Sequence, residues 1–490
     1  MTPAPAPAQH KPVDAHAIDQ PRRRIAELPG PKGLPLLGNV LAFRSPQLHL
    51  QLETWHRQFG AFYQVQLGKH RILVVGDHRV IANVLKDRPE GFSRTARLRE
   101  ISVEMGLKPG LFGAEGSDWA LQRRMVMASF DPTHVRQYFP ALVKVAQRLK
   151  RRWAAAAIEH RTIDLQADLM RFTVDTIAGL AFGAEVNTIE SDQDVIQQHL
   201  DKIFPALFER LVAPLPIWRF WPSRRDRELK RSVLAVNQEV DRLITAARSR
   251  LGCDPAVQTQ PNNLLEAMIL AADRVDASLN DQQIAGNVLT MLLAGEDTTA
   301  NTIAWMIYLL WQNPLKLSRA REEVKSIVTR PDAPTLDQMA QLTFVEACIQ
   351  ETMRLKPVAP QLPVQALRDT VIGDIEVPAG TVVINLLRTD AVDERWVPQA
   401  TEFKPERWLN SSPLNKKLSM PFGAGPRICP GRYLAMLEMK IALAMLLAHF
   451  ELTEVGTAQK HEPQERLSFT MAPVGLRMQL GQAHTPYTEP

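Results

Sequence analysis

Three kinds of feature are scarce or missing in this 490-residue sequence. Only three cysteines occur, Cys253, Cys348 and Cys429, too few for a disulfide framework or a four-cysteine iron–sulfur cluster. Apolar runs are too short to span a bilayer, and residues 1–24, rich in Pro, Ala and charge, lack the apolar core of a signal peptide. We therefore expect residues 1–24 to be a disordered tail, and the protein to be cytoplasmic, without a transmembrane anchor.

Charge of either sign is not concentrated anywhere in the chain. The 58 Lys and Arg residues outnumber the 53 Asp and Glu residues, giving a formal net charge of +5. Because no basic tract is interleaved with aromatic residues, we expect no nucleic-acid partner. Residues 204–231 do crowd aromatic beside basic residues. This segment is open to three interpretations: a lid over a substrate channel, a patch touching a membrane surface, or packed core with helices broken by proline.

The alternation of apolar and polar residues predicts mostly helix with a smaller strand-rich part. Two short runs with two-residue alternation, at 62–67 and 71–75, predict a hairpin. Long helices are predicted between residues 119 and 311, then at 314–328, 336–355 and after 431, with strands near 371–377 and 381–387. Since no internal repeat or low-complexity linker interrupts them, residues 25–490 are expected to form one domain of the mainly α (α+β) class.

The segment FGAGPRICPG, residues 422–431, places Cys429 in a glycine-rich loop directly before the last long helix. A thiolate at a helix N-terminus is favoured by the helix dipole and by unpaired N–H groups, so it is a ready metal ligand. Gly423 lets the backbone fold tightly against a flat cofactor, and Gly431 lets the helix approach closely. Phe422 can shield the sulfur from water. Each feature alone has a purely structural explanation, whereas together they predict a metal-binding cysteine.

This loop resembles the cysteine-ligand loop of the cytochrome P-450 family, on the residues Phe422, Gly425, Arg427, Cys429 and Gly431. Four further family signatures follow the family's order, and together they cover most of the chain. The resemblance implies the P-450 fold, a large helical region with a smaller β-rich region around a buried haem b. It also implies that Cys429 binds the iron and that Arg427 faces a haem propionate.

Three of these signatures imply a structural triad and a second propionate contact. Glu351 and Arg354 form an ExxR unit on one helix face, and in the family an arginine like Arg407 in PERW joins such a pair beneath the haem. Trp119 and Arg123, one helical turn apart, match a Trp-x-x-x-basic pair whose polar ends meet a propionate. The alternatives are a solvated ion pair and a stacked surface pair, respectively.

The segment AGEDTT, residues 294–299, lies late in an apolar run. A bend at Ala294–Gly295 would open a groove for dioxygen beside the iron. The resemblance implies that Asp297 and Thr298 are the acid–alcohol pair that delivers protons for cleavage of the O–O bond. The alternative is a hydroxyl that only hydrogen-bonds within its own helix and bends it.

Rough alignment with the family predicts which residues surround the substrate. They are Met291, Ala294, Val358, Ala359, Phe469 and Met471. Residues 95–113 would close one side of the pocket. Because Gln361 and Thr470 are the polar exceptions in the aligned segments, we expect a hydrophobic small-molecule substrate with few polar anchors.

The resemblance implies an oxidoreductase, a haem-thiolate monooxygenase that inserts one atom of dioxygen into a hydrophobic substrate by hydroxylation or epoxidation. No GxGxxG motif follows a predicted strand, so electrons are expected from a separate ferredoxin or flavodoxin with its NAD(P)H-dependent reductase. A peroxide-using peroxygenase or isomerase on the same fold, and a non-catalytic haem sensor, are the alternatives. The Asp297–Thr298 pair favours the monooxygenase.

One propionate contact departs from the family pattern. Many members carry a basic residue about five positions before the aspartate that is Asp369 here, whereas this chain has Val364. Arg388 is a candidate substitute, although an exposed strand arginine is the simpler interpretation. Basic residues are also expected to flank the thiolate side and to receive an acidic redox partner, with a solvated face as the alternative. They are Arg124, Lys416, Lys417, Arg432 and Lys440.

Overall fold

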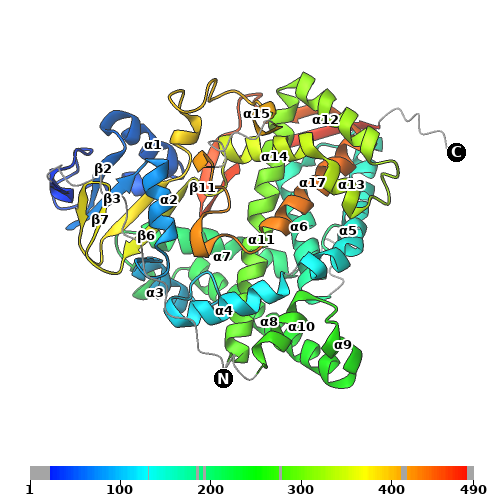
Figure 1. Ribbon diagram of the computed structural model, residues 1–490, viewed down its shortest axis with the longest axis horizontal. Coiled ribbons are helices and arrows are strands. Elements are labelled where there is room, and N and C mark those ends of the chain that lie inside the picture. The colour runs from blue at the N-terminus through cyan, green and yellow to red at the C-terminus, as the bar shows by residue number, and fades with distance from the viewer. Residues whose placement is uncertain are drawn as a thin grey trace, which may run out of the picture.

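Helices make up most of the computed structural model, and they surround one long central helix, α11 (Figure 1). The structure describes residues 22–130, 132–183, 187–190, 195–274, 279–409 and 417–482. Its helices are α1 (Leu48–Phe59), α2 (His78–Lys86), α3 (Ala96–Glu104), α4 (Gly116–Ser129), α5 (Pro132–Ile158), α6 (Leu165–Phe182), α7 (Val195–Val212), α8 (Arg224–Cys253), α9 (Pro255–Thr259), α10 (Leu264–Ala272), α11 (Asp281–Trp311), α12 (Pro314–Ile327), α13 (Leu336–Gln341), α14 (Thr343–Leu355), α15 (Glu406–Leu409) and α17 (Arg432–His449).

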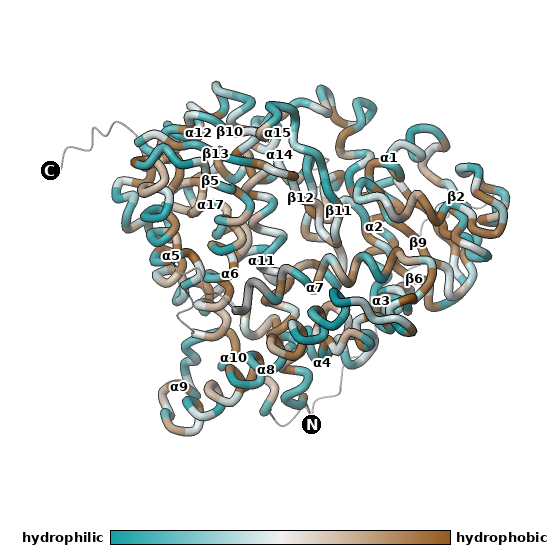
Figure 2. Tube along the Cα trace, turned by 180° about the vertical axis from the view of Figure 1, so that it is seen from behind, coloured by the Kyte–Doolittle hydropathy of each residue, from teal (hydrophilic) through white to brown (hydrophobic). Residues whose placement is uncertain are grey.

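The strands form four small sheets. They are β1 (Arg23–Arg24), β2 (Phe62–Leu67), β3 (His70–Val75), β4 (Phe92–Ser93), β5 (Ile163–Asp164), β6 (Gln361–Ala366), β7 (Thr370–Ile372), β8 (Ile375–Val377), β9 (Val382–Leu386), β10 (Phe450–Gly456), β11 (Glu465–Ser468), β12 (Thr470–Pro473) and β13 (Arg477–Gln482). The largest sheet among the described residues has the order β2-β3-β9-β6-β4, and hydrophobic residues run along β9 in Figure 2. The predicted mainly helical fold and the hairpin β2–β3 are confirmed.

One long helix predicted from the sequence is two. Residues 336–355 divide at Leu342 into α13 and α14. The carboxylate of Glu323, on α12, accepts hydrogen bonds from the backbone N–H groups of Phe344 and Val345 at 2.7 and 2.8 Å. It thereby satisfies donors that an uninterrupted helix would have bonded internally, so a residue distant in sequence sets where α14 begins.

Two residues of the expected disordered tail over 1–24 belong to a sheet instead. Arg23 and Arg24 form β1, which pairs in parallel with Ile375 and Glu376 of β8. The guanidinium of Arg23 also forms an ion pair with Asp374 at 2.6 Å. Residues 1–21 of the expected tail lie outside the described residues.

Helix α11 begins at a capping box made by Asn280 and Gln283. It continues through Ala294 and Gly295 without interruption. A Cβ at Gly295 would lie 2.6 Å from the Cδ1 atom of Ile177, so the glycine is explained by the close approach of α6. No helix of the described part, α11 included, combines the length and the apolar character that crossing a bilayer requires.

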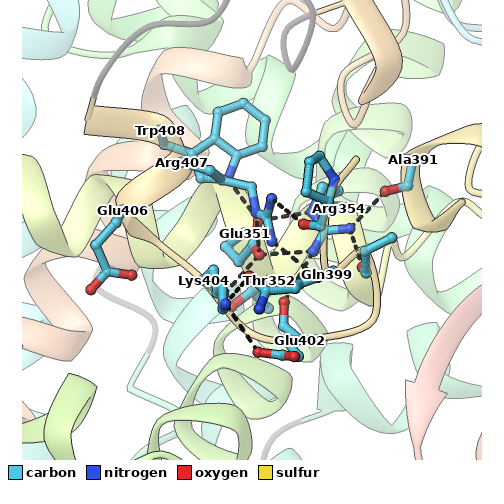
Figure 3. A network of polar contacts seen from close by, with 12 residues as sticks. Glu351, Thr352, Arg354, Ala391, Gln399, Glu402, Lys404, Glu406, Arg407 and Trp408 are labelled. Carbon is cyan, nitrogen blue, oxygen red and sulfur yellow. Dashed lines mark hydrogen bonds and ion pairs between the residues drawn. The ribbon is translucent and has the colours of Figure 1, made fainter. Parts of the chain in front are cut away.

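The predicted triad is assembled around one fully buried carboxylate, that of Glu351 (Figure 3). Arg354 donates two hydrogen bonds to Glu351, both at 2.8 Å, and Arg407 donates a third at 2.9 Å. The indole N–H of Trp408 and the backbone N–H of Lys404 also donate to it, at 2.8 and 2.9 Å. These bonds join α14 to the segment that leads into the Cys429 loop.

Arg388 fits neither expected role. Its side chain is buried, and its guanidinium contacts Glu53 at 2.9 Å and Glu465 at 3.0 Å. Those carboxylates come from α1 and β11, far away in the sequence, and both hold the arginine below the surface. It is therefore neither an exposed strand arginine nor a cavity residue that could replace the missing basic group at Val364, which is itself buried in the core under the sheet.

Candidate functional site

A large cavity of about 1680 Å³ lies where α11, α4, the 422–431 loop and the β11–β12 hairpin meet. Its wall includes Cys429 and the helix residues Ala294 and Thr298. Residues 95–113 contribute to another wall, as expected, although nine of them form helix α3 rather than loop. Every predicted motif therefore has at least one residue near this space, except the buried triad.

Cys429 is held at the cavity wall by the backbone on both sides of it. Its N–H donates to the carbonyl of Phe422 at 2.9 Å, and α17 starts three residues later. Burial raises the pKa of the Cys429 thiol, whereas the N–H of Gly431 and the charges of Arg123 and Arg432 oppose that rise. A Cβ at Gly431 would lie 4.0 Å from the sulfur, an ordinary van der Waals contact, so space beside Cys429 does not by itself require glycine here.

Most of the residues predicted for the site line the cavity. They are Trp119, Arg123, Met291, Ala294, Thr298, Val358, Ala359, Phe422, Gly423, Arg427, Cys429, Gly431 and Phe469. Met471 is an error of the sequence prediction, since it is 0% exposed in the core and pairs across the hairpin with Leu467. Asp297 does not line the cavity directly.

The two members of the predicted acid–alcohol pair have different surroundings. Thr298 faces the cavity and donates its hydroxyl proton to the carbonyl of Ala294 at 2.8 Å. The carboxyl group of Asp297 accepts hydrogen bonds from the Thr470 hydroxyl and, at 2.6 Å, from the Asn301 amide. Burial raises the pKa of Asp297, and these two donors counteract the rise. Among these partners Thr470 lines the cavity, so it is the contact between Asp297 and that space.

Sequence reasoning missed two arginines that border the same cavity, Arg88 and Arg94. Arg88 is 3% exposed, and its Nε and Nη2 atoms have no hydrogen-bond partner among the described residues. The Nε atoms of Arg94 and Arg427 are also buried without a partner. Burial and the charge of Arg427 lower the pKa of Arg88 to about 10, while Glu115 acts in the opposite direction. Three guanidinium groups thus share one nearby carboxylate.

Arg427 itself is already engaged on one side. Its Nη2 donates to the carbonyl of Ala114 at 2.7 Å and to the carboxylate of Glu115. Its guanidinium lies over the Trp119 ring at 4.9 Å. Trp119 therefore stacks with Arg427 of the cysteine loop, a contact that the spacing of Trp119 and Arg123 did not predict.

Glu438 is a second group that sequence reasoning missed. It is 1% exposed on α17, lines the cavity, and accepts a hydrogen bond from Thr299. Its Oε1 atom has no partner among the described residues. Burial raises the pKa of Glu438 to about 8, so its carboxyl group is mostly protonated at neutral pH. An isolated acid inside the apolar run 434–448 was the available sequence signal.

The aromatic and basic segment 204–231 divides into two parts. Phe204 lines the cavity, whereas Phe220 and Trp221 are 71% and 77% exposed. The exposed pair excludes packed core as a description of the whole segment.

The basic residues expected beside the thiolate are only partly at the surface. Arg124, Lys417 and Arg432 are exposed. Lys440 is buried, and it is engaged by Glu346 at 2.7 Å and by the carbonyl of Met339 at 3.0 Å, so it is not available to a partner. Lys416 lies outside the described residues.

Comparison with known proteins identifies the family of this chain. The family model described as cytochrome P-450 matches residues 28–480. The chain belongs to the cytochrome P-450 family. It is 28% identical over 94% of its length to a self-sufficient cytochrome P-450 monooxygenase of Oidiodendron maius, and 28% identical over 89% to a cytokinin hydroxylase of Arabidopsis thaliana. It is 26% identical over 94% to a steroid 17-alpha-hydroxylase/17,20 lyase of Felis catus.

These P-450 relatives differ in how much of their length the chain covers. It spans 43% of the Oidiodendron protein, but 87% of the cytokinin hydroxylase and 94% of the steroid hydroxylase. The Oidiodendron relative is thus more than twice as long as the matched region.

The cofactor of the P-450 family is haem b, and the residues around this cavity fit it. Haem carries two propionate carboxylates, and the cavity edge has unpartnered guanidinium nitrogens on Arg88, Arg94 and Arg427. A dianionic edge would supply the missing hydrogen-bond acceptors and compensate the excess positive charge. Haem iron also needs a ligand from the protein, and the sulfur of Cys429 lies in the cavity wall. Arg88 and Arg94 could also replace the basic residue that is missing at Val364, because they place positive charge at the cavity from a different part of the chain.

We predict that Arg88→Met and Arg94→Met each accelerate haem loss, by roughly tenfold or more, because each removes a charge-assisted hydrogen-bond donor to a propionate. The rate is measured by transfer of haem to excess apomyoglobin. The apoprotein of each variant should be at least as stable as the wild type, since an uncompensated buried charge has gone. Arg97→Met is the matched control, because Arg97 also lines the cavity but already donates to backbone carbonyls. Equal haem loss in all three variants would contradict the assignment.

We predict that Glu438 makes the protein less stable as pH rises. The pKa of Glu438 in the folded state, about 8, exceeds its ordinary value of 4.5. Folding therefore favours the protonated form, and the stabilisation present at low pH is lost as pH rises from about 4.5 through about 8. The free energy of unfolding of wild type and Glu438→Gln, measured in urea across this range, should converge at low pH and diverge in favour of the glutamine at high pH. Parallel pH profiles would show that Glu438 ionises normally.

Proposed function

We propose that this chain is a haem-thiolate monooxygenase that inserts one atom of dioxygen into an apolar organic substrate. The observation that carries the proposal is that Cys429 and Thr298 line one large, mainly apolar cavity, at whose edge three guanidinium groups have nitrogens without a partner among the described residues. Names of the relatives support it, since they include monooxygenases and hydroxylases. The same observation disfavours a non-catalytic sensor, which needs neither a roomy cavity nor an acid and an alcohol beside it.

The residues of this chain would divide the work. Cys429 would bind the haem iron as a thiolate, and Arg88, Arg94 and Arg427 would hold the propionates. When bound, haem with a thiolate ligand activates dioxygen and supplies the oxidising power. Thr298 would turn its hydroxyl from the carbonyl of Ala294 toward the cavity, where it could donate a proton.

Two acids would hold the protons that this reaction consumes. Asp297 reaches the cavity through Thr470, and Glu438 lines it directly beside Thr299. Both carboxyl groups are shifted by burial toward the protonated form. They are therefore better proton donors at neutral pH than ordinary surface carboxylates would be.

The lining of the cavity supports an apolar substrate. Met291 and Ala294 of α11, Val358 and Ala359 after α14, and Phe469 of the hairpin tip form much of it. Burying apolar surface against these side chains would provide most of the binding free energy, and few polar groups are placed to orient the ligand. The volume of about 1680 Å³ includes the space that haem itself would take.

The reaction is tested first by the spectrum of the purified, reduced protein under carbon monoxide. We expect a Soret band shifted to a markedly longer wavelength than that of a histidine-ligated haem, as an axial thiolate produces. This band should be lost in Cys429→Ser. Substrate oxidation should then require dioxygen, reduced nicotinamide cofactor and redox proteins together. Turnover on hydrogen peroxide with reductants inert would instead establish the peroxygenase alternative.

We also propose that a separate, acidic ferredoxin or flavodoxin, reduced by its NAD(P)H-dependent reductase, delivers the electrons. Support comes from the exposed residues Arg124 and Arg432, of which Arg432 begins α17 and lies close enough to Cys429 to influence its thiol. Opposite charge on the partner would steer it to the side of the haem nearest the sulfur. Some relatives differ in this respect, because their names describe a P-450 that is self-sufficient or is joined to a reductase in one chain. The separate electron donor is therefore proposed for this chain and not for those relatives.

We predict that Arg124→Glu combined with Arg432→Glu slows electron transfer from such a partner by about tenfold at low ionic strength, because two attractive charges become repulsive. Stopped-flow reduction under carbon monoxide measures the rate. The difference should shrink as salt is added, since screening removes the steering. Arg225→Glu on α8, an exposed arginine of another helix, is the matched control and should leave the rate unchanged. A salt-independent effect would argue for structural damage rather than steering.

A further inference from the structure

The tip of the β11–β12 hairpin is a single residue, Phe469, between the paired residues Ser468 and Thr470. Its φ angle is +89°, in a region that residues with a bulky side chain rarely occupy. Such a conformation costs free energy and persists only where contacts around it hold the residue in place. The contacts of Phe469 and of its neighbour Thr470 therefore define the state of this tip.

On one side the tip is held by aromatic rings. Phe469 stacks on Phe204 of α7 with ring centroids 4.6 Å apart and planes within 8°. It also contacts Phe112, from the segment between α3 and α4, at 5.9 Å and 58°. All three rings line the cavity. A molecule in the cavity therefore competes with these ring contacts.

On the other side the tip holds the acid of α11. The Thr470 hydroxyl donates to the carboxyl group of Asp297, which otherwise accepts only from Asn301 among the described residues. Hairpin and helix meet here because β12 packs along α11. The backbone N–H of the following residue, Met471, donates to the carbonyl of Val358 at 2.8 Å and fixes the base of the tip. Phe469, whose ring lines the cavity, is thus directly bonded in sequence to Thr470, whose hydroxyl donates to Asp297.

We propose that the Phe469–Thr470 tip couples occupancy of the cavity to Asp297: an apolar molecule that displaces Phe469 from Phe204 draws the Thr470 hydroxyl off the Asp297 carboxyl group. This inference rests on the proposed monooxygenase function, since it concerns the regulation of the same site. Phe469 and Thr470 are positioning residues in this scheme. Asn301, which lies on α11 with Asp297, keeps its own hydrogen bond throughout.

Release of Thr470 would change the protonation of Asp297. Two hydrogen-bond donors favour the charged carboxylate, and burial favours the neutral acid. Removing one donor shifts the balance to the neutral acid, which takes up one proton from solvent. That proton is then available to the cavity, and Asp297 returns to the carboxylate when it has been given up. No electron is transferred in this step, so the tip would make the proton available only while a substrate is present.

The test is infrared difference spectroscopy of the haem-loaded protein, in the carbonyl-stretch region where neutral carboxylic acids absorb. The Asp297 band is assigned by its absence from Asp297→Asn. Glu438 supplies an internal reference, since its neutral acid is not bonded to the tip. Biphenyl, dodecane and adamantane serve as probes because they carry no carbonyl group, and the one that gives the largest Soret shift is used.

In the wild type at neutral pH, the probe should increase the Asp297 band at least twofold. Thr470→Val should show the increased band without any probe, whereas Thr470→Ser, which keeps the hydroxyl, should behave as the wild type. In Phe469→Leu the probe should still shift the Soret band but leave the Asp297 band unchanged. Phe208→Leu is the matched control, because Phe208 also lines the cavity on α7 without a ring contact to Phe469, and its response should be that of the wild type.

Three results would overturn the coupling. They are an Asp297 band that none of the probes changes in the wild type, equal bands in Thr470→Val and Thr470→Ser, and a normal response in Phe469→Leu. Each of these can occur while the reduced carbon monoxide spectrum and dioxygen-dependent product formation are normal. Failure of the coupling is thus distinguishable from failure of the proposed function, in which the thiolate spectrum itself would be missing.

Discussion

The buried carboxylate of Glu351 is the constraint on which the cysteine side of the molecule depends. It accepts five hydrogen bonds, from the side chains of Arg354, Arg407 and Trp408 and from the backbone of Lys404. Arg354 in turn donates to the carbonyls of Ala391 and Ala400, both at 2.6 Å. Removing one partner of such a buried network typically costs 3–5 kcal/mol, because the remaining charge is left uncompensated. The path of the backbone toward Cys429 is therefore set by a buried carboxylate that the protein itself supplies with hydrogen-bond donors.

The cavity shows the opposite arrangement, since its charges are left incomplete by the protein. Arg88, Arg94 and Arg427 face it with unpartnered nitrogens, and Glu438 faces it with an unpartnered oxygen. Burying such groups lowers stability unless a ligand completes them. A dianionic cofactor would complete the arginines, whereas protonation at neutral pH relieves Glu438. The unpartnered groups thus lower the free energy of unfolding at the place where the cofactor and protons would bind. The Glu351 carboxylate, in contrast, has hydrogen-bond donors on both of its oxygens.

Sequence reasoning identified groups of neighbouring residues where short spacings fix their relative positions, and the chemical roles predicted for these residues stay predictions. The ExxR unit, the Cys429 loop and the Asp297–Thr298 pair each lie within one turn or loop, so their geometry follows from local structure. It failed where long-range contacts decide. Arg388 is buried because Glu53 and Glu465 reach it from α1 and β11. Met471 is buried in the core, where its backbone N–H donates to the carbonyl of Val358 more than 100 residues earlier in the chain, and no local pattern reveals this contact. Arg88 and Arg94 belong to no motif, and only the folded chain brings them beside Arg427.

The position of Asp297 gives a physical reason for separating the acid from the alcohol of the pair. Thr298 faces the cavity, but Asp297 contacts it only through Thr470, on a strand about 170 residues further along the chain and next to Phe469. An acid open to the cavity would supply protons whether or not a substrate was bound, and activated oxygen would then be reduced without product. Placing the acid behind a hydroxyl, whose neighbour is an aromatic ring in a strained conformation, makes its availability depend on what the ring contacts. A cavity with few polar side chains has few hydrogen bonds with which to recognise a ligand. Contact between the ligand and the ring of Phe469 would therefore signal that the cavity is occupied.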